Sequence, residues 1–415
     1  MTNYSFTSVC EKLDRRQRID LGFERIDALL SLLGNPERDL RVVQVVGTNG
    51  KGTTAITLAA ALEEFGFSAA AYLSPHLLSY TERVMVHGEF VTEEEFAVTM
   101  GRVIVIADAN GVPATQFELL TAGALGMFRD AGLDFAVMEA GLGARHDATT
   151  ASSPEMVVLT NVGLDHTEIL GDTVEDIARE KLASLASANT LVLGTEDVPV
   201  VEIARHECER IGVHLVEAKD DTDGAATSAL ISLPGYAEHN VRVGVTAAEV
   251  LAGERLDVGA RERVEQRVVG KLPGRFERYE VRGVPVIVDG GHNVSGLAAA
   301  LDASRRVYGV RPLGVVFGVL KDKDIVGMLS RLSEEAHVLV LTRPDNERAA
   351  DPEWIEREHG PRDLGGRRAR VQADTGDALA TAVAEMEWVD GVVLVTGSLY
   401  TGSRVLGSLR GVREG

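Results

Sequence analysis

A glycine-rich turn near the start of the chain combines residue types that can hold phosphate groups. An apolar run precedes the turn, an Ala- and Leu-rich helical segment follows it, and its residues are Gly47, Thr48, Asn49, Gly50, Lys51, Gly52, Thr53 and Thr54. Such a turn presents backbone N–H groups and a helix N-terminus to phosphate oxygens, while Lys51 adds a point charge. The pattern predicts a nucleoside triphosphate site. Its spacing differs from the standard Walker A motif, so a glycine-rich surface turn is the alternative.

Short apolar runs alternate with longer helical patterns from Arg41 onward. The strand-like runs of this first half are 41–46, 69–73, 135–139, 156–161 and 190–193. This alternation predicts an α/β fold with a mostly parallel sheet that helices cover on both faces. A polar stretch at 218–227 interrupts the pattern, and we expect it to be a surface loop.

The alternation starts again after Pro273-Gly274, a dipeptide that marks a break in chain direction. Strand-like runs follow at 284–288, 313–317, 337–341 and 392–395, separated by helical segments. The sequence therefore predicts two domains, 1–273 and 274–415, and the second is a smaller Rossmann-like α/β domain.

Composition and charge restrict the classes of partner. The 415 residues carry a formal net charge of −21, which repels nucleic acid and anionic lipid. Cys10 and Cys208 lie far apart without metal-type spacing, so we expect neither a disulfide framework nor a zinc site. No signal-peptide pattern or membrane-length apolar run occurs in the sequence, which favours a cytoplasmic protein without a nucleic-acid or membrane partner.

Further segments, in a fixed order along nearly the whole chain, resemble the folate branch of the Mur ligase superfamily. Together with the glycine-rich turn, these segments are Leu73-Ser74-Pro75-His76-Leu77, Glu82-Arg83-Val84, Gln116-Phe117-Glu118-Leu119-Leu120-Thr121, Glu139-Ala140-Gly141-Leu142-Gly143, Leu164-Asp165-His166-Thr167, Pro273-Gly274-Arg275, Asp289-Gly290-Gly291-His292-Asn293, Leu320-Lys321-Asp322-Lys323-Asp324, Thr342-Arg343-Pro344-Asp345-Asn346 and Thr396-Gly397-Ser398-Leu399-Tyr400. The resemblance implies a P-loop central domain of the Mur ligase type, followed by the smaller domain.

The resemblance also implies an activity. A ligase of this branch uses ATP and Mg²⁺ to convert a carboxylate into an acyl phosphate, which the amine of L-glutamate then attacks. The acceptor would be dihydropteroate, a (tetrahydro)folyl carboxylate, or both, and the products dihydrofolate and folylpolyglutamates. The partners are therefore small molecules, and we expect a monomer.

Site residues follow from the same resemblance, position by position. The expected metal ligands are Ser74, Glu139, His166 and a carbamylated Lys181. Besides the turn, the expected nucleotide contacts are Asn240, Arg275 and Asp289. The expected catalytic residues are Lys51, Lys181 and His292, the last on the glutamate side. The expected substrate contacts are His76, Arg83, Phe117, Glu118, Arg145, His146 and Ser398.

Lys181 falls in a segment at 173–187 that is expected to be a helix, with Thr173 as N-cap and Asp176 three residues later. A carbamate would turn this cation into an oxygen ligand for a second metal ion. The alternative is an exposed helix lysine that pairs with acidic neighbours.

Several residues depart from the branch's usual pattern and leave the acceptor open. They are Ala140, Ala144, His146, Thr150, Leu182 and Val294. Of these, His146 would adjoin the pterin. Two other functions compete with the ligase: another Mur-type amino-acid ligase, and a catalytically inactive nucleotide-binding sensor.

Overall fold

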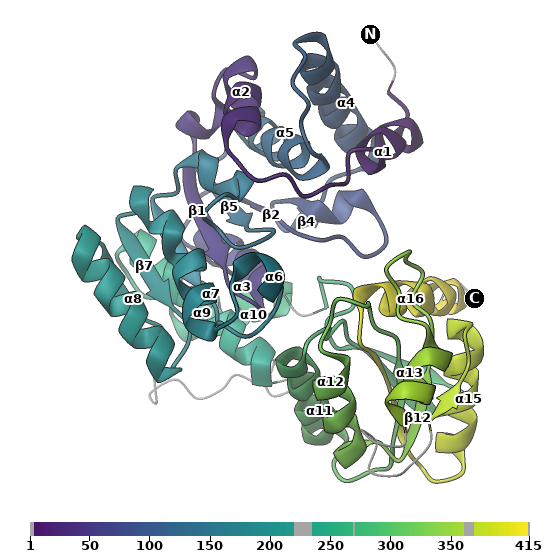
Figure 1. Cartoon of the computed structure of the whole chain (residues 1–415). Coiled ribbons are helices and arrows are strands. Elements are labelled where there is room, and N and C mark those ends of the chain that lie inside the picture. The colour runs from purple at the N-terminus through teal and green to yellow at the C-terminus, as the bar shows by residue number, and fades with distance from the viewer. Residues whose placement is uncertain (1–3, 220–234, 269, 361–368, 414–415) are drawn as a thin grey trace. The chain divides into compact units, whose positions relative to one another are not determined.

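The computed structural model describes residues 4–219, 235–268, 270–360 and 369–413 (Figure 1). The chain divides into two compact units, residues 1–229 with 237–269 and residues 230–236 with 270–415. Each unit has its own sheet and its own apolar core. The predicted α/β class is therefore confirmed.

The first unit is built on a sheet with strand order β4-β3-β2-β5-β1-β6-β7-β8 among the described residues. Strands β2, β5, β1, β6, β7 and β8 run parallel to one another. Strands β3 and β4 form an antiparallel edge beside β2. Their bounds are β1 Arg41–Val46, β2 Ala69–Tyr72, β3 Val84–Val86, β4 Glu89–Phe90, β5 Phe135–Glu139, β6 Met156–Leu159, β7 Thr190–Leu193 and β8 His214–Glu217.

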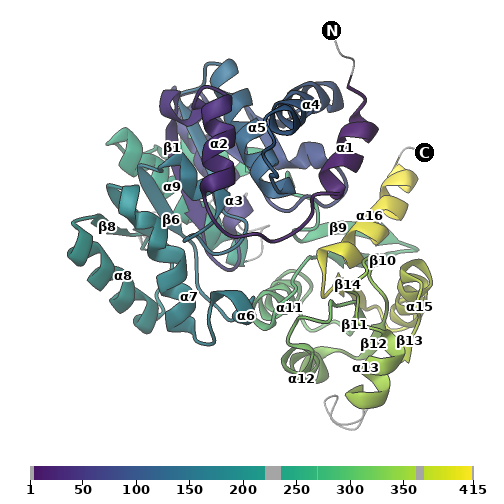
Figure 2. The same ribbon diagram turned by 45° about the horizontal axis from the view of Figure 1, so that its top comes forward.

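Helices cover both faces of this sheet. Their bounds are α1 Phe6–Asp14, α2 Glu24–Leu32, α3 Lys51–Glu64, α4 Glu93–Ala109, α5 Gln116–Asp130, α6 Thr167–Leu170, α7 Val174–Lys181, α8 Val198–Ile211, α9 Gly235–Ala252 and α10 Val258–Val268, with short 3₁₀ turns η1 Pro36–Asp39, η2 Tyr80–Arg83, η3 Ala148–Ser152 and η4 Leu182–Ser187. Helices α1, α2, α4 and α5 pack together as one group, and α7 lies beside α8 (Figure 2). Helix α3 packs against β1, β2 and β5, and α10 packs against α3.

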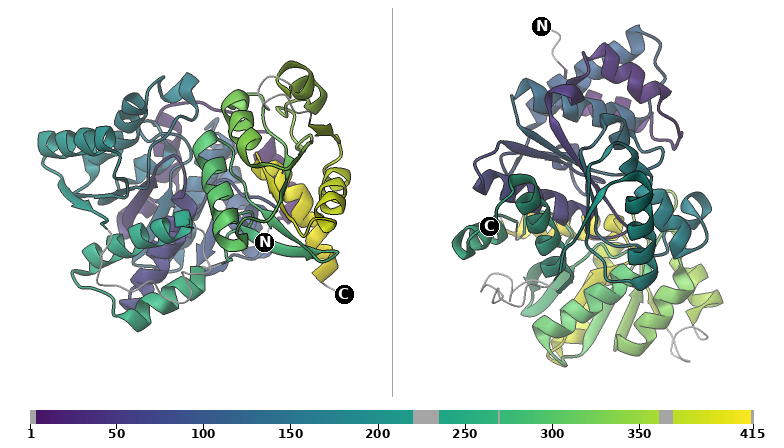
Figure 3. Two further views of the ribbon diagram at one scale, coloured as in Figure 1. Left: turned by 90° about the horizontal axis from the view of Figure 1, so that it is seen from below. Right: turned by 90° about the vertical axis from the view of Figure 1, so that its left-hand side faces the viewer.

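The second unit has strand order β13-β12-β11-β14-β10-β9, parallel except for β9. Its elements are β9 Glu277–Val281, β10 Val284–Val288, α11 Val294–Tyr308, β11 Leu313–Phe317, α12 Ile325–Glu335, β12 Val338–Leu341, α13 Pro352–Glu358, β13 Arg370–Val371, α15 Thr375–Glu387, β14 Val392–Thr396 and α16 Leu399–Arg413. Helices α11 and α12 lie on one face of the sheet and α15 and α16 on the other (Figure 3). Right-handed crossovers produce this division, because the strand order reverses direction after β13.

The strands predicted from apolar runs are present, with small differences at their ends. The runs at 41–46, 135–139, 190–193, 284–288 and 313–317 match β1, β5, β7, β10 and β11. Strand β6 ends at Leu159, before Thr160 and Asn161, which instead contact the glycine-rich turn. The loop expected at 218–227 lies outside the described residues from position 220 onward, and Ala218 and Lys219 are in neither helix nor strand.

The helix predicted at 173–187 is shorter than expected. Thr173 caps α7 as predicted, since its hydroxyl accepts a hydrogen bond from the N–H of Asp176. The α-helix ends at Lys181, and residues 182–187 form the 3₁₀ turn η4. Leu182 and Leu185 are buried in the core that covers β6 and β7, and the tighter turn brings both to that core.

Among the described residues, no helix is both long enough and apolar enough to cross a bilayer.

Glu265 on α10 is an acidic side chain in a buried position, 4% exposed. Burial, and then the charge of Glu262, raises its pKa from 4.5 to about 7. The unfolded chain releases this proton near pH 4.5 and the folded chain only near pH 7. Ionisation therefore lowers stability progressively across that window.

A Glu265→Gln variant is expected to gain about 1–2 kcal/mol of unfolding free energy at pH 8, and less than about 0.5 kcal/mol at pH 5. Urea unfolding at the two pH values measures both quantities. Glu209→Gln, an exposed change on α8, is the control. An equal gain at both pH values would contradict the assigned cause.

Candidate active site

The glycine-rich turn joins the end of β1 to the start of α3 in a conformation that only glycine tolerates. Gly47 has φ +149°, and a Cβ there would lie 1.9 Å from Thr160 Oγ1. Gly50 has φ +82°, and a Cβ there would lie 2.2 Å from Asn240 Oδ1. The two glycines thus let the backbone pass between β6 and α9. Asn240, predicted as a nucleotide contact, lies against this turn and is 3% exposed.

Thr160 and Asn161 hold the turn in place. Asn161 accepts a hydrogen bond from Asn49 N through its Oδ1 (3.0 Å) and donates one to Asn49 O through its Nδ2 (2.9 Å). Thr160 Oγ1 also donates to Asn49 O, at 2.7 Å. Neither residue was predicted to belong to the site, because the apolar run at 156–161 was expected to be a strand throughout. Thr160 and Asn161 are two adjacent polar residues that directly follow an apolar run. That pattern is the sequence signal that could have indicated a role in the site.

The first turn of α3 carries donors that have no intrahelical acceptor. Its N-cap is Gly50, which provides no side-chain cap. The N–H groups of Lys51, Gly52 and Thr53 therefore remain available to an anion, as at other helix N-termini that bind phosphate. Thr54 differs, since its N–H donates to Gly50 O and its buried hydroxyl to Asn240 O. Its hydroxyl thus holds α9, and its expected contact with the nucleotide stays a prediction.

Two lysines meet at one carbonyl of the turn. Lys51 Nζ lies 3.2 Å from Gly47 O, and Lys181 Nζ donates to the same oxygen at 2.8 Å. Lys181 is 4% exposed, which excludes the alternative of an exposed helix lysine. Burial, and then the charge of Lys51, lowers the pKa of Lys181 to about 7. As an ammonium group, Lys181 braces the turn and cannot act as a metal ligand.

Ser74 and Glu139 come together at the carboxyl edge of the sheet. Glu139 ends β5 beside Val45 of β1, and its Oε2 accepts a hydrogen bond from Ser74 N at 2.8 Å. Parallel strands place ligand sites at this edge. His166 is the N-cap of α6 with φ 51°, and its Nε2 lies 3.9 Å from Asp165 Oδ1.

The donor set at this edge fits a hard divalent cation only in part. Among the described residues, no group of three or more His, Cys, Asp or Glu side chains is arranged to hold a metal. The hydroxyls of Thr53 and Ser74 and the carboxylate of Glu139 are oxygen donors of the kind that Mg²⁺ prefers, and Mg²⁺ commonly keeps several waters. An incomplete protein shell is therefore compatible with a phosphate-bound magnesium ion.

His76 is held as a neutral imidazole on the loop after β2. Its Nδ1 accepts a hydrogen bond from Arg83 Nε at 2.8 Å, and its ring lies 4.1 Å from the ring of Tyr80. Burial, and then the charge of Arg83, lowers the pKa of His76 to about 3. The Nε2–H is consequently a fixed donor. Tyr80, which was not among the predicted site residues, anchors this group by donating a hydrogen bond from its hydroxyl to Asp14 Oδ1 at 2.5 Å.

Phe117 and Glu118 begin α5 but have different surroundings. The Phe117 ring lies against the backbone of Gly141, where a Cβ would come within 2.7 Å of it, and 5.8 Å from the Tyr72 ring. Glu118 completes a capping box with Thr115 and accepts a hydrogen bond from Arg25 at 3.0 Å. Both Glu118 oxygens thus have protein partners, so the structure shows a stabilising role for this predicted substrate contact.

Arg145 and His146 lie on the exposed loop after β5. Glu180 binds Arg145 twice, at the backbone N–H (3.1 Å) and at Nε (2.9 Å). The His146 ring lies 6.0 Å from the ring of Phe23. Buried Asp147 fixes the loop by accepting hydrogen bonds from two backbone N–H groups at its start.

In the second unit, Asp289 organises the turn after β10. Its Oδ2 accepts from Tyr236 OH (2.6 Å) and Phe276 N (3.0 Å), and its Oδ1 from Gly291 N (2.9 Å). His292 Nδ1 lies 3.0 Å from Gly290 O. Arg275 lies beside the same turn, since a Cβ on Gly290 would come within 2.8 Å of its guanidinium.

Ser398 is the remaining predicted residue of this unit. It is 2% exposed, and its Oγ accepts the N–H of Tyr400 at the start of α16.

Two family models match the chain. The Mur ligase middle domain matches residues 45–229, and the Mur ligase, glutamate ligase domain matches residues 274–399. The dihydrofolate synthase/folylpolyglutamate synthase of Escherichia coli is 32% identical over 428 residues, covering 99% of this chain and 96% of that protein. The corresponding protein of Bacillus subtilis is 29% identical and covers 91% and 93%.

Solved structures agree with these matches over the same length. Mycobacterium tuberculosis folylpolyglutamate synthase complexed with ADP superimposes with a TM-score of 0.88 at 27% identity, covering 98% of both chains. The E. coli protein in complex with DHPP and ADP gives a TM-score of 0.84 at 28% identity, covering 99% and 98%. A bifunctional folylpolyglutamate synthase/dihydrofolate synthase with Mn, AMPPNP and L-glutamate bound gives 0.81 at 27%, with the same coverage. The chain belongs to the dihydrofolate synthase/folylpolyglutamate synthase group of the Mur ligases, a family of ATP-dependent ligases.

Proposed function

We propose that this protein uses ATP to join L-glutamate to dihydropteroate, to a (tetrahydro)folyl carboxylate, or to both. The observation that carries the proposal is the uncapped helix start of α3, with Lys51 beside it and the Ser74–Glu139 pair at the same edge of the sheet. This is an arrangement for phosphoryl transfer, in a chain whose second unit matches a glutamate ligase domain.

The reaction needs activation because a carboxylate is a poor electrophile. A carboxylate oxygen of the acceptor attacks the γ-phosphorus of ATP, ADP leaves, and an acyl phosphate forms. The amine nitrogen of glutamate then attacks the acyl carbon, phosphate leaves, and the nitrogen loses a proton. In the first step negative charge spreads over the phosphoryl oxygens, and Lys51 with the first-turn N–H groups of α3 would stabilise that charge.

We propose that Ser74, Glu139 and His166 hold the magnesium ion, which would neutralise phosphate charge when bound. Lys181 would join them only after its amine has reacted with CO₂, giving a carbamate and a proton. Intact-mass measurement at neutral pH should then show a mass increase of one CO₂ that disappears on acidification. A Lys181→Gln variant should lack the increase. An unmodified mass for the active wild-type protein would refute the carbamate.

The acceptor would bind on the first unit and the amino acid on the second. We propose that His76, held by Arg83, donates a hydrogen bond from its Nε2–H to the acceptor. The ring system of the acceptor would lie among aromatic side chains. These acceptor-side residues are His76, Arg83, Phe117, Arg145 and His146. On the second unit, we propose that Arg275 and Asp289 contact the nucleotide and that His292 and Ser398 serve the amino-acid side.

The protein is also proposed to be a cytoplasmic monomer that binds neither nucleic acid nor membranes. Its charge of −21 supports the last two points. Light scattering of the purified chain tests the monomer, and a mass twice that of one chain would exclude it.

The decisive experiment supplies MgATP and L-glutamate with either dihydropteroate or tetrahydrofolate. Phosphate release and glutamyl products are then quantified by mass. Product from dihydropteroate establishes dihydrofolate synthesis, and product from tetrahydrofolate establishes chain extension. If ATP binds but neither acceptor supports phosphate release, the folate assignment fails, and the departures around His146 direct a search for other carboxylates.

A further inference from the structure

A glutamine lies in the middle of β1, where the sequence is otherwise apolar. Gln44 has two valines on each side along the strand, and its side chain is 0% exposed. Strand β1 is an interior strand between β5 and β6, and such strands are normally continuous apolar runs. A polar side chain is tolerated in this position only when it makes hydrogen bonds. The hydrogen bonds of Gln44 therefore indicate its role.

Gln44 binds the loop that follows β5. We call residues 140–150 the β5 loop. The Nε2 of Gln44 donates to Thr149 Oγ1 at 2.7 Å and to Thr150 Oγ1 at 2.8 Å. Both threonines lie in the turn η3, where the loop returns to the sheet. A side chain from inside β1 thus anchors the far end of the β5 loop.

The two threonine hydroxyls extend this network into the loop. Thr149 Oγ1 donates to Asp147 Oδ1 at 2.6 Å, and Thr150 Oγ1 donates to Ala144 O at 2.7 Å. Each hydroxyl has one proton, and that proton is already used, so each hydroxyl can only accept from Gln44. The amide of Gln44 must therefore direct its two N–H groups toward the loop.

The oxygen of the same amide has no such role. Within the described part of the chain, Gln44 Oε1 is buried without a hydrogen-bond partner. A buried carbonyl oxygen without a donor is unfavourable. Turning the amide over would give this oxygen two hydroxyl donors, but Asp147 and Ala144 would then lose theirs. The observed orientation leaves one acceptor unpaired and keeps the bonds that shape the loop.

The β5 loop carries residues that the proposed function places at the acceptor, Arg145 and His146. On its outer side, Glu180 of α7 binds Arg145 at the backbone N–H and at Nε. On its inner side, Asp147 accepts hydrogen bonds from two backbone N–H groups at the start of the loop. Gln44 connects this inner side to the sheet, so it fixes where the loop stands.

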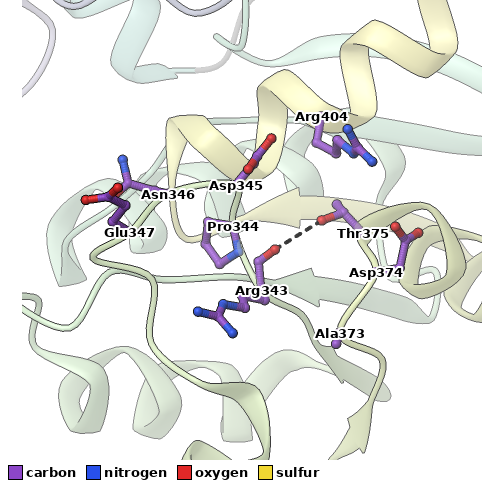
Figure 4. Close-up of a pocket in the computed structure, with 9 residues that line it drawn as sticks. All are labelled: Arg343, Pro344, Asp345, Asn346, Glu347, Ala373, Asp374, Thr375 and Arg404. Atoms are coloured by element: carbon purple, nitrogen blue, oxygen red, sulfur yellow. Dashed lines mark hydrogen bonds between the residues drawn. The ribbon is translucent and has the colours of Figure 1, made fainter. Parts of the chain in front are cut away.

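Loops of the second unit are tied by donors of a different origin. Beside the charged pocket in Figure 4, Thr375 Oγ1 donates to Arg343 O at 3.4 Å, the bond drawn there. Thr342 Oγ1 donates to Ala373 O at 3.2 Å. Both of these donors lie outside the strands of their sheet, whereas Gln44 lies within β1. Gln44 thus spends an interior strand position on holding a loop.

We propose that Gln44 is a positioning residue for the acceptor, because it holds the β5 loop so that Arg145 and His146 meet the acceptor in one orientation. Gln44 itself is buried and does not contact a reactant. The identity of the acceptor rests on the proposed function, whereas the hydrogen-bond network stands without it. Gln44 also lies three residues before Gly47, so a change that merely disturbed β1 would impair ATP binding as well.

The first test compares the wild-type chain with Gln44→Met, which keeps the length of the side chain and removes both N–H donors. With the acceptor that the wild-type chain uses, the KM for the acceptor should rise roughly tenfold, while the KM for ATP changes by less than about twofold. Gln266→Met, a change at an exposed glutamine of α10, is the matched control and should leave both KM values near wild type. An unchanged KM for the acceptor, or equal rises in both KM values, would overturn the proposal.

A double variant tests the connection through Thr150. Thr150→Val removes the hydroxyl that lies between Gln44 and Ala144. The KM for the acceptor in Gln44→Met/Thr150→Val should therefore rise by less than the product of the two single effects. A rise equal to that product would mean that the two residues act independently, which also overturns the proposal.

The last test is limited trypsin digestion, which does not require turnover. Arg145 is an exposed arginine of the β5 loop, and Arg18, an exposed arginine between α1 and α2, is the reference site. Gln44→Met should be cut after Arg145 at least roughly tenfold faster than the wild-type chain and Gln266→Met, with equal rates after Arg18.

Two results of the digestion would overturn the proposal. Equal rates after Arg145 in all three proteins would mean that Gln44 does not hold the loop, and faster cleavage at both sites would mean general unfolding. If the wild-type chain ligates neither acceptor, the proposed function fails, while the digestion still decides whether Gln44 holds the β5 loop.

Discussion

A Lys51→Met variant is expected to lose ATP-dependent ligation by about 10²–10³-fold in kcat/KM while keeping its fold. Lys51 Nζ lies over the carbonyls of Gly47 and Thr48, where it faces any phosphate held by the first turn of α3. Methionine keeps most of the length and apolar surface of the side chain but removes the charge. Steady-state phosphate release at varied ATP measures the loss.

Lys219→Met is the control, because Lys219 is an exposed lysine of the same unit that pairs with Glu217. It should retain wild-type turnover. Circular dichroism should show the same helix content for both variants. If Lys51→Met turned over ATP as fast as Lys219→Met, the glycine-rich turn would not be the phosphate site.

The sequence predicted the interior strands better than the edges of the sheets. Interior parallel strands such as β1 and β11 are buried on both faces, so they appear as continuous apolar runs. The edge strands have weaker signals. Strand β9 alternates between intermediate and exposed residues, β4 is Glu89–Phe90 and β13 is Arg370–Val371. Such strands are recognisable only from their neighbours, which a linear pattern does not provide.

Some residues of the candidate site could likewise be predicted from the sequence and others could not. The glycine-rich turn was predictable because its own residues carry the signal. The bonds of Thr160 and Asn161 to that turn were not, because they join residues more than a hundred positions apart. Glu118 shows a role that the resemblance did not suggest: besides its expected substrate contact, which stays a prediction, it completes a capping box and binds Arg25.

A Gly50→Ala variant is expected to lose about 3 kcal/mol of stability and the ability of ATP analogues to raise its melting temperature. At φ +82° an alanine is strained by roughly 1–2 kcal/mol, and its Cβ would also overlap the Asn240 side chain at 2.2 Å. Relief of this overlap must move either α9 or the turn that carries the free N–H groups. Thermal unfolding with and without the analogue measures both effects.

Gly66, at the other end of α3, is a control that separates backbone strain from overlap with the Asn240 side chain. It has φ +86°, nearly the value of Gly50, but a Cβ there meets nothing within 4 Å. Gly66→Ala should therefore cost only about 1 kcal/mol and leave nucleotide protection intact. A Gly50→Ala/Asn240→Gly variant should recover part of the stability, because it removes the atoms that overlap. If Gly50→Ala behaved like Gly66→Ala, backbone strain alone would explain the glycine, and the close approach of Asn240 would have no role in shaping the phosphate site.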